Sequence, residues 1–391
     1  MRTLHPVIFG RLRKWPGLLL RHRAPEAPFL TRILWILFTS ALSWPWRRYE
    51  DLRYGPAVRR TKITRAPVFI IGYWRSGTTH VHNVLSLSGE FTFLSLFQTL
   101  APEFFLSSER ILKPLFGRLT PPRRPMDNVA LSIDAPQEEE LALLAVTKRT
   151  LYHQMFFPKQ ASSILLRDGL FDGLTVKESA EWRSCYEQLC KKLTFASNGK
   201  RLVLKNPANT CRIRALLDLF PDARFIHVVR NPLDVFPSCM HLFRTLVPIC
   251  RLQQVHYTAI REYVMVSYET ILRRYLDERS LVPERNLVEV RFEDFEASPV
   301  ALLERIYDTF GIAGFDRDRN GFERYLDSVR NFRKGVYSID DQERIAVWKR
   351  WRFAFDAFGY PIEKRSPLGT SGETVRESDA ATTCNRRVRD A

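Results

Sequence analysis

The sequence predicts an α/β fold in which a central parallel sheet is flanked by helices. Four short apolar runs, at residues 68–71, 202–204, 224–229 and 287–292, have the length and the side chains of buried strands. Helical segments separate these runs, and strands that alternate with helices favour a parallel sheet with helices on both faces. We therefore expect a three-layer architecture.

Two of the helices can be delimited from their end signals. Thr210 is expected to cap a helix with apolar residues at helical spacing, and Pro221 stops it. Ser298 and Pro299 form an N-cap and a first helical residue, and Gly311 ends the apolar stripe that follows. Both helices follow an expected strand, as the alternating pattern requires.

Three segments of the chain differ in composition. Residues 1–65 form a basic, apolar leader with 14 Lys and Arg against three acids, so it carries +11 of the net charge of +17. Residues 66–362 contain the four expected strands and form the main domain. Residues 363–391 contain almost nothing apolar, and we expect this tail to be disordered. Because the leader is so basic, we expect an anionic partner, which is a phosphorylated cofactor, nucleic acid or acidic lipid.

The leader contains an uncharged stretch at residues 33–46, flanked by Arg32 and by Arg47 and Arg48. It is shorter than the roughly 20 residues of a membrane-spanning helix. Its tryptophans and basic flanks suit a helix lying in a membrane interface, and a helix buried against the main domain is the alternative. No signal peptide is evident and the six cysteines form no C-x-x-C pair, so we expect a cytoplasmic protein, peripheral at the membrane face if the leader binds lipid.

The first expected strand runs into a loop with two glycines five residues apart. Its candidate anion-binding residues are Gly72, Arg75, Ser76, Gly77, Thr78 and Thr79. Free backbone N–H groups and the helix dipole attract phosphate to such a turn, and an arginine adds a planar, permanently charged group. The ATP-binding loop G-x-x-x-x-G-K-[ST] has a lysine after the second glycine, whereas this chain has Thr78 there. The loop is therefore suited to a phosphate but lacks the lysine that contacts the γ-phosphate of ATP.

A second candidate anion site follows the strand at residues 224–229. Arg230 ends that strand, Asn231 and Pro232 are the N-cap and first residue of a helix, and Ser238 lies two turns further on. Arg230 is either a structural ion-pair partner of Asp234 or a second phosphate anchor. Ligands bind beyond the carboxyl ends of parallel strands. In the second interpretation, Arg230 and the first loop therefore lie at the same edge of the sheet and bind the same ligand.

These two segments resemble the PAPS-dependent sulfotransferases. The loop at residues 72–79 is similar to their 5′-phosphosulfate loop, and residues 230–238 to their 3′-phosphate motif. Residues 286–299 resemble the family's YEDL element, and residues 122–129 and 136–140 resemble a largely bacterial branch. The resemblance covers residues 67–359. It implies a P-loop-like three-layer fold, a catalytic domain at residues 66–362, and PAPS as co-substrate without a metal ion.

The resemblance also implies catalytic residues. Many family members have a histidine four residues after the lysine that corresponds to Lys205, and this chain has Asn209 there. An asparagine accepts no proton near neutral pH, so it can only orient the acceptor. Lys205 is expected either to stabilise the leaving group, as Arg75 would, or to form an ion pair. The base must then come from elsewhere, and Glu138 is the first choice among three consecutive glutamates, although acids in a first helical turn are common.

Four further side chains complete the candidates. Arg333 and Lys334 resemble a family element that closes over the 3′-phosphate, and we expect them to bind the cofactor. His80 and His82 follow the first loop, and we expect them to be packed helix residues rather than catalysts.

The sequence thus predicts a sulfotransferase that moves the sulfuryl group of PAPS to a hydroxyl or amine of an acceptor. The basic leader favours an acceptor at a membrane, such as a glycolipid. For a sulfotransferase we expect no nucleic-acid partner. A P-loop-type small-molecule kinase is the alternative, against which Thr78 argues. A third hypothesis is a non-catalytic nucleic-acid or lipid binder, whose affinity would collapse with salt.

Overall fold

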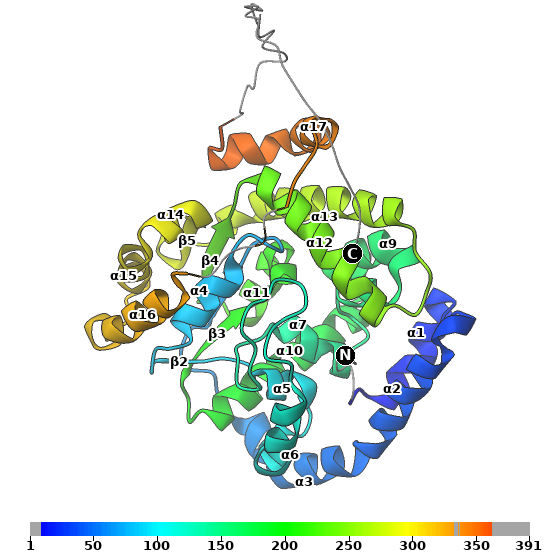
Figure 1. The fold of residues 1–391 in the computed structure, drawn as a ribbon. Coiled ribbons are helices and arrows are strands. Elements are labelled where there is room, and N and C mark those ends of the chain that lie inside the picture. The colour runs from blue at the N-terminus through cyan, green and yellow to red at the C-terminus, as the bar shows by residue number, and fades with distance from the viewer. Residues whose placement is uncertain (1–8, 332–334, 336, 362–391) are drawn as a thin grey trace, which may run out of the picture. The chain divides into compact units, whose positions relative to one another are not determined.

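Five parallel strands form the central sheet of the protein (Figure 1). The structure is a computed structural model, and it describes residues 9–331, 335 and 337–361. The strands are β1 (Val68–Ile71), β2 (Phe91–Thr92), β3 (Arg201–Lys205), β4 (Arg224–Val229) and β5 (Leu287–Arg291), in the order β2-β3-β1-β4-β5. The four predicted strands are confirmed. The two-residue edge strand β2 was not predicted, because it is too short to show a period.

Helices cover both faces of the sheet, as the alternation of β1 shows. Phe69 and Ile71 belong to a core shared with the helices α5, α10, α11 and α13. Val68 and Ile70 belong to a separate core, shared with α4, α15 and α16. Side chains of successive strand residues point to opposite faces, so the two cores lie on either side of the sheet. The predicted three-layer α/β fold is confirmed.

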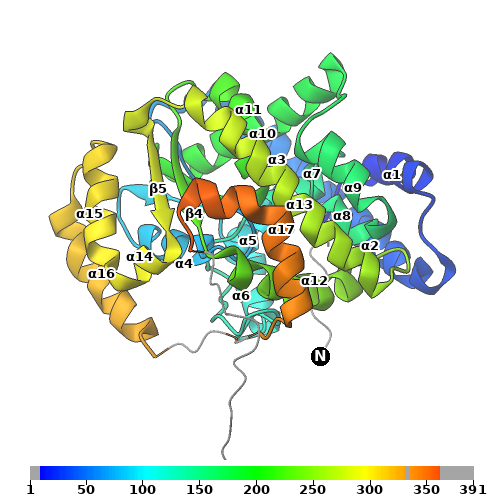
Figure 2. The ribbon, with the colours of Figure 1, turned by 90° about the horizontal axis from the view of Figure 1, so that it is seen from above.

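The helices differ in what they cover. Those that pack on the two faces of the sheet or follow its strands are α4 (Thr78–Leu85), α5 (Leu96–Leu100), α6 (Phe105–Leu119), α10 (Val176–Ala196), α11 (Ile213–Leu219), α14 (Phe292–Ala297), α15 (Pro299–Thr309) and α16 (Phe315–Val329). Those that contribute side chains to a third core are α1 (Trp15–His22), α2 (Leu30–Leu42), α7 (Glu139–Val146), α8 (His153–Phe156), α9 (Ala161–Ile164), α12 (Pro232–Cys250), α13 (Tyr257–Glu278) and α17 (Asp341–Phe358). The long helix α3 (Trp44–Arg60) follows α2. In Figure 2, α12, α13 and α17 lie side by side, as their shared core requires.

Of the two predicted helix starts, the one at Ser298 is correct in position and the one at Thr210 is not. Thr210 was expected to cap a helix, and this prediction is wrong: α11 has Arg212 as its N-cap, and Thr210 lies in a preceding short 3₁₀ segment. The Thr210 hydroxyl instead accepts a hydrogen bond from the Gly72 amide at 2.8 Å. Ser298 is the N-cap residue of α15 and Pro299 its first residue, but no side-chain cap bond forms.

The described part of the leader consists of helices that share a core with the rest of the protein. Trp15 and Leu18 of α1 and Ile33 and Ile36 of α2 are buried in the same cluster as residues of α8 and α12. A second face of α2 remains exposed. The segment at residues 33–46 is thus buried against the main domain on one side and exposed to solvent on the other. It combines features of the two alternatives, a helix buried against the main domain and a helix lying in a membrane interface.

Candidate active site

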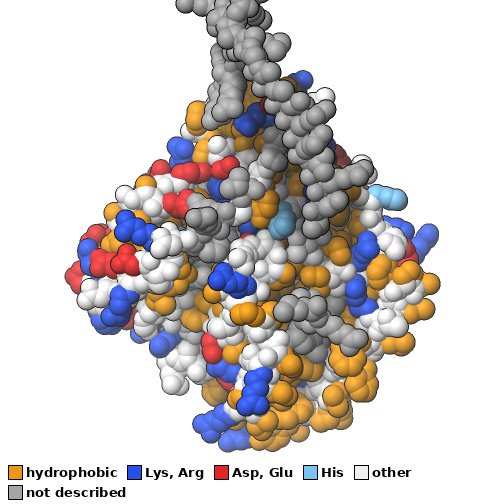
Figure 3. Space-filling view, viewed as in Figure 1, with side chains coloured by type: hydrophobic (Ala, Val, Ile, Leu, Met, Phe, Trp, Pro, Cys, Tyr) orange, Lys and Arg blue, Asp and Glu red, His pale blue; other side chains and the backbone are white. Residues whose placement is uncertain are grey.

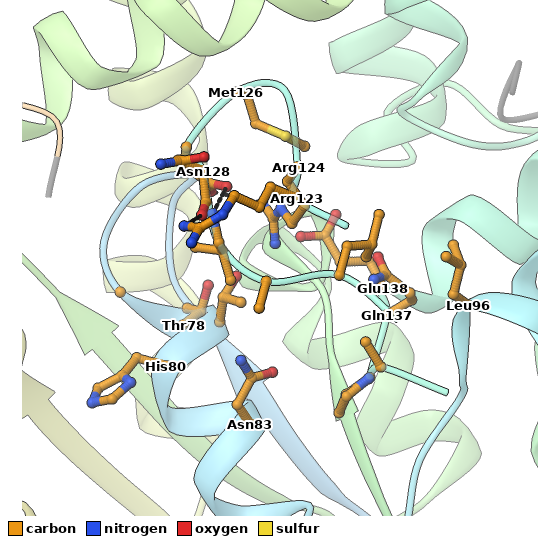
Figure 4. A pocket seen from close by; sticks show the side chains of 18 of the residues that line it. Thr78, His80, Asn83, Leu96, Arg123, Arg124, Met126, Asn128, Gln137 and Glu138 are labelled. Atoms are coloured by element: carbon orange, nitrogen blue, oxygen red, sulfur yellow. Dashed lines mark hydrogen bonds and ion pairs between the residues drawn. The ribbon is translucent and has the colours of Figure 1, made fainter. Parts of the chain in front are cut away.

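A cavity of about 1970 Å³ lies beyond the carboxyl ends of the strands. The loop after β1, the segment at residues 120–138 and the helices α12 and α14 form its walls. Because β3 and β4 pair with opposite edges of β1, the chain leaves the sheet in two directions at this point, where α/β proteins bind their ligands. Figure 4 shows Thr78, Arg124 and Glu138 around this space.

The two glycines of the loop after β1 are required by close packing. Gly72 and Gly77 have φ angles of +143° and +96°, which side chains rarely permit. A Cβ atom on Gly72 would lie 2.3 Å from the Val228 carbonyl oxygen, and one on Gly77 would lie 2.0 Å from the Phe292 ring. The loop therefore reaches its position against β4 and α14 only because both residues lack a side chain.

The predicted anion-binding residues of this loop fall into two groups. The Gly72 amide donates to Thr210, and the Ser76 hydroxyl donates to the Tyr73 carbonyl at 2.7 Å, so both shape the loop from within. In contrast, Arg75, Gly77, Thr78 and Thr79 line the cavity. Because α4 begins at Thr78, the N–H groups of Thr78 and Thr79 have no acceptor within the helix and are available to an anion, whereas the His80 N–H donates to the Gly77 carbonyl at 3.0 Å.

Arg75 joins the two candidate anion sites. Its Nε donates to the Ser238 hydroxyl of α12 at 2.8 Å, across 163 residues of sequence. Its Nη1 donates to Asp127 at 2.6 Å, and Arg124 pairs with the same carboxylate at 3.0 Å. Asp127 and Arg124 belong to the segment that resembled the bacterial branch, but the sequence alone did not single them out. A carboxylate between two guanidinium groups shows that this corner of the cavity suits an anionic group.

Arg230 also lines the cavity, directly after β4. Its guanidinium lies 5.5 Å from the centre of the Phe292 ring, and its Nη2 lies 3.5 Å from Asp234. Asp234 is 55% exposed, so this ion pair contributes little to stability. The Asn231 side chain accepts from the Leu233 amide at 3.0 Å, which confirms the predicted cap of α12.

Glu138 is the one member of the three consecutive glutamates that lines the cavity in the described structure. It is the N-cap residue of α7 and forms an ion pair with Lys205 at the end of β3. It also accepts a hydrogen bond from the Tyr152 hydroxyl, which in turn accepts from the Trp74 ring nitrogen at 3.1 Å. Lys205 is buried behind Glu138, and burial lowers the pKa of its ammonium group although Glu138 opposes this effect. Tyr152 lines the cavity and was not found from the sequence.

Glu140 lies in the wall behind the cavity. It is fully buried and forms an ion pair with Arg212 at 2.8 Å. Burial disfavours its charge, but Arg212 and hydrogen bonds from Asn206 and Thr150 hold its pKa below the usual value. This glutamate therefore has its full set of partners within the protein and serves the packing of α7.

Glu139 occupies a different buried site. It accepts hydrogen bonds from the Tyr186 hydroxyl and the Asn209 amide, both at 2.7 Å, and burial raises its pKa to about 7. Asn209 is itself fully buried and is not among the residues that line the cavity. Its position behind the wall makes it a support for α7 rather than a contact of the acceptor.

The raised pKa of Glu139 predicts a pH-dependent loss of stability. Its carboxyl stays protonated in the folded protein until about pH 7, whereas in the unfolded chain it ionises near its ordinary pKa of 4.5. Its contribution to stability is therefore fully present below pH 4.5 and is lost as the pH rises to about 7. Relative to a Glu139→Gln variant, the wild type should lose roughly 3 kcal/mol of unfolding free energy over this range.

Urea unfolding between pH 4.5 and pH 8 measures this difference. The Glu187→Gln change on α10 is the matched control, because it makes the same substitution at a half-exposed side chain outside the core, which pairs with Lys191 at 2.8 Å. Stability curves of wild type and Glu139→Gln that run parallel over this range would show that Glu139 titrates normally.

The remaining candidates lie at the edges of the site. His82 is fully buried, and burial lowers its pKa to about 3, which confirms that it is a packed residue. His80 lines the cavity, with its ring edge-on to Phe295 at 5.3 Å. Arg333 and Lys334 lie outside the described residues, as does the tail at residues 363–391. Within the described ranges, no group of three or more His, Cys, Asp or Glu side chains is placed to hold a metal ion.

Comparisons with known proteins agree with the geometry of the site. A sulfotransferase family model matches residues 67–317. The omega-hydroxy-beta-dihydromenaquinone-9 sulfotransferases of Mycobacterium bovis and Mycobacterium tuberculosis are each 30% identical to this chain over 319 residues, which is 82% of this chain and 81% of the relative.

Solved structures show the same fold. A sulfotransferase of Mycobacterium tuberculosis superimposes with a TM-score of 0.65 at 17% identity, covering 87% of this chain and 91% of the other. A sulfotransferase of Mycobacterium avium gives 0.64 at 19% identity, covering 82% and 83%. From the family match and the 30% identical relatives together, the chain belongs to the sulfotransferase family and is an enzyme of that family.

Proposed function

We propose that this protein transfers the sulfuryl group of PAPS to a hydroxyl group on a hydrophobic, membrane-associated lipid. The observation that carries this proposal is the division of the cavity into two halves. One half is cationic, with Arg75, Arg124 and Arg230 beside the first turn of α4. The other is apolar, and its lining includes Met126, Leu141, Met155, Leu242, Leu246 and Ile249.

The cationic half suits a nucleotide with an anionic group at each end. Arg75 and the free N–H groups of α4 would hold the 5′-phosphosulfate, and Arg230 with Ser238 would hold the 3′-phosphate. Ser238 already accepts a hydrogen bond from Arg75, so the two anchors share a side chain. Thr78 stands where an ATP-binding loop has its lysine, which disfavours the kinase alternative.

The apolar half suits a large hydrophobic acceptor. Binding cavities for small molecules usually measure about 300 to 1,000 Å³, so a volume of 1970 Å³ leaves room for a second substrate beside the donor. The Mycobacterium relatives are named for a menaquinone derivative with an ω-hydroxyl group. We infer an acceptor of the same physical kind, a long apolar chain that carries a hydroxyl.

The residues around Glu138 fit a proton-transfer role. The acceptor oxygen attacks the sulfur of PAPS, its proton passes to the Glu138 carboxylate, and the bond from sulfur to the 5′-phosphate oxygen breaks with its electron pair left on PAP. Protonation of Glu138 ends its ion pair with Lys205, which frees that cation to stabilise the charge on the leaving oxygen. Asn209 supports this arrangement from behind by holding Glu139.

A thermal-shift titration tests the donor. At a hundred times its Kd, PAP should add about 2.7 kcal/mol to the free energy of unfolding and raise the Tm by several degrees. ATP with Mg²⁺ should raise it much less, because the loop lacks the γ-phosphate lysine. If ATP with Mg²⁺ stabilises the protein and PAP does not, the assignment is overturned in favour of a kinase.

The acceptor is tested by mass spectrometry with PAPS as donor. The panel consists of an ω-hydroxylated menaquinone, a hydroxylated glycolipid, a long-chain alcohol and a long-chain amine, with a small polar alcohol for comparison. We expect one added SO₃ on the apolar hydroxyl compounds. Product on a small polar alcohol in preference to all of these would contradict an apolar acceptor.

A further inference from the structure

The helices α2 and α3 present an apolar face to solvent. Its side chains, here called the α2 face, recur along α2 with a spacing of four residues and continue onto α3: Leu30, Leu34, Trp35, Phe38, Leu42 and Trp44, each at least half exposed. Ten of the 19 exposed large hydrophobic side chains in the described ranges lie between residues 12 and 52. Figure 3 shows hydrophobic side chains gathered along the lower right edge of the molecule, where Figure 1 places α2. This density of exposed apolar surface indicates a binding surface.

The α2 face is held in a fixed orientation. On the opposite side of α2, Ile33 and Ile36 are buried in the third core. The Arg32 guanidinium donates to the carbonyl oxygens of Arg251 at 2.5 Å and Pro248 at 3.3 Å, at the carboxyl end of α12. The exposed side chains thus stand on a helix that the fold clamps against α12, and their exposure follows from that packing.

The charge around this face favours an anionic partner. Between residues 9 and 65, nine exposed side chains are Lys or Arg, and the exposed acid in this range is Asp51. The basic side chains are Arg13, Arg21, Arg23, Arg48, Arg53, Arg59, Arg60, Lys62 and Arg65. Aromatic and aliphatic side chains bordered by such an excess of cations match the interface of an anionic lipid bilayer.

A helix lying in the interface fits this segment better than a spanning helix. The stretch Ala27–Arg60 is long and apolar enough to be weighed as a membrane span. However, α2 has 13 residues and is about 20 Å long, whereas a bilayer core is about 30 Å thick. The polar Thr39 and Ser40 are buried on its protein side, and α3 carries arginines along its length. The α2 face is therefore one side of a surface helix.

The apolar half of the cavity ends beside the helix α2, which carries the α2 face on its other side. Leu246, Ile249 and Cys250 line that half and lie in the last turns of α12, the part of the helix to which Arg32 of α2 binds. At the opposite wall, the cavity lining begins again at Thr120, directly after α6. That helix has its own exposed stripe of Ile111, Leu115 and Leu119, and α3 packs against it. The cavity thus lies between two helices with exposed apolar stripes.

We infer that the α2 face docks on an anionic lipid membrane and places the apolar half of the cavity at the lipid surface. The acceptor then passes from the bilayer along the end of α12 to Glu138 without crossing water. The route rests on the proposed lipid acceptor, whereas docking itself does not. A hydrophobic substrate and a hydrophobic docking face share one physical reason: both avoid the cost of exposing apolar surface to water.

Vesicle co-sedimentation of the full chain tests this inference. The probes are vesicles of phosphatidylcholine alone and of phosphatidylcholine with phosphatidylglycerol, at low and at high salt. A Leu34→Ser/Phe38→Ser variant removes two side chains of the α2 face, which are 62% and 58% exposed. Val176→Ser/Ile345→Ser is the matched control, because it removes two exposed apolar side chains from α10 and α17.

Wild type and control should bind the anionic vesicles. The affinity of the α2-face variant for the same vesicles should be lower by a factor of about ten or more. Binding should be weaker on phosphatidylcholine alone and at high salt. PAP should stabilise all three proteins equally, which separates this result from a failure of the proposed donor.

Three outcomes would overturn docking. One is equal vesicle binding by wild type and the α2-face variant, and another is an equal loss by the control. The third is an absence of vesicle binding together with a wild-type dimer that the Leu34→Ser/Phe38→Ser change converts to a monomer, which would assign the α2 face to a second copy of the chain.

Discussion

Replacing Glu138 with glutamine should lower kcat by about 10²- to 10⁴-fold with the lipid acceptor that the panel identifies. Glutamine keeps the size of the side chain and accepts a hydrogen bond from Tyr152, but it takes no proton from an acceptor hydroxyl. It also leaves the Lys205 ammonium without its carboxylate partner. Initial rates with saturating PAPS measure the loss.

Stabilisation by PAP should be retained or increased in the Glu138→Gln variant, because Glu138 is not part of the cationic half and its loss frees Lys205 for the 5′-phosphate of PAP. The matched control is Asp134→Asn. Asp134 also lines the cavity and pairs with a lysine, Lys113, but it lies away from Lys205 and is 63% exposed. A Glu138→Gln enzyme within about threefold of the wild-type kcat would remove Glu138 from the reaction, and a large loss in the control would move the base to residue 134.

Replacing Arg230 with alanine should weaken PAP binding by about ten- to a hundredfold. A hydrogen bond to a charged group contributes about 1.5 to 3 kcal/mol, and in this variant the 3′-phosphate would lose one or two such bonds. Isothermal titration with PAP measures the change in Kd. Titration with adenosine 5′-phosphosulfate, which lacks the 3′-phosphate, should show little difference between variant and wild type.

An Asp234→Asn variant separates the two interpretations of Arg230. It removes the ion pair at 3.5 Å but leaves the guanidinium in the cavity. If Arg230 binds the 3′-phosphate, this variant should bind PAP at least as tightly as the wild type, since a competing anion is gone. A loss equal to that of Arg230→Ala would mean that Arg230 acts only through its ion pair with Asp234.

Local patterns in the sequence predicted the sheet and the position of its ligand edge. Each predicted strand is a short apolar run bounded by polar or breaking residues, and the loop at residues 72–79 encodes its turn through neighbouring residues. Such features depend on interactions within a few residues, so they can be read without the fold. The Thr210 cap failed for the opposite reason: its hydroxyl binds the Gly72 amide, 138 residues away.

The contacts among the side chains of the site could not be predicted from local patterns. Arg75 contacts Ser238 and Asp127 across separations of 163 and 52 residues, and no local pattern links them. The sequence made Glu138 the first choice among the three glutamates but could not decide between them, because their surroundings depend on how α7 is rotated against β3 and α10. Packing buries Glu139 against Tyr186 and leaves Glu138 at the cavity.

The sequence by itself therefore determined the fold class, the family resemblance and the anion-binding loop, all of which follow from the order of neighbouring residues. Only the tertiary structure decided which carboxylate meets the cavity, which loop residues are turned inward, and that α2 packs on the apolar end of α12 with its other face exposed. Those relations arise when distant elements pack together, and burial then fixes the environment and the charge of each side chain.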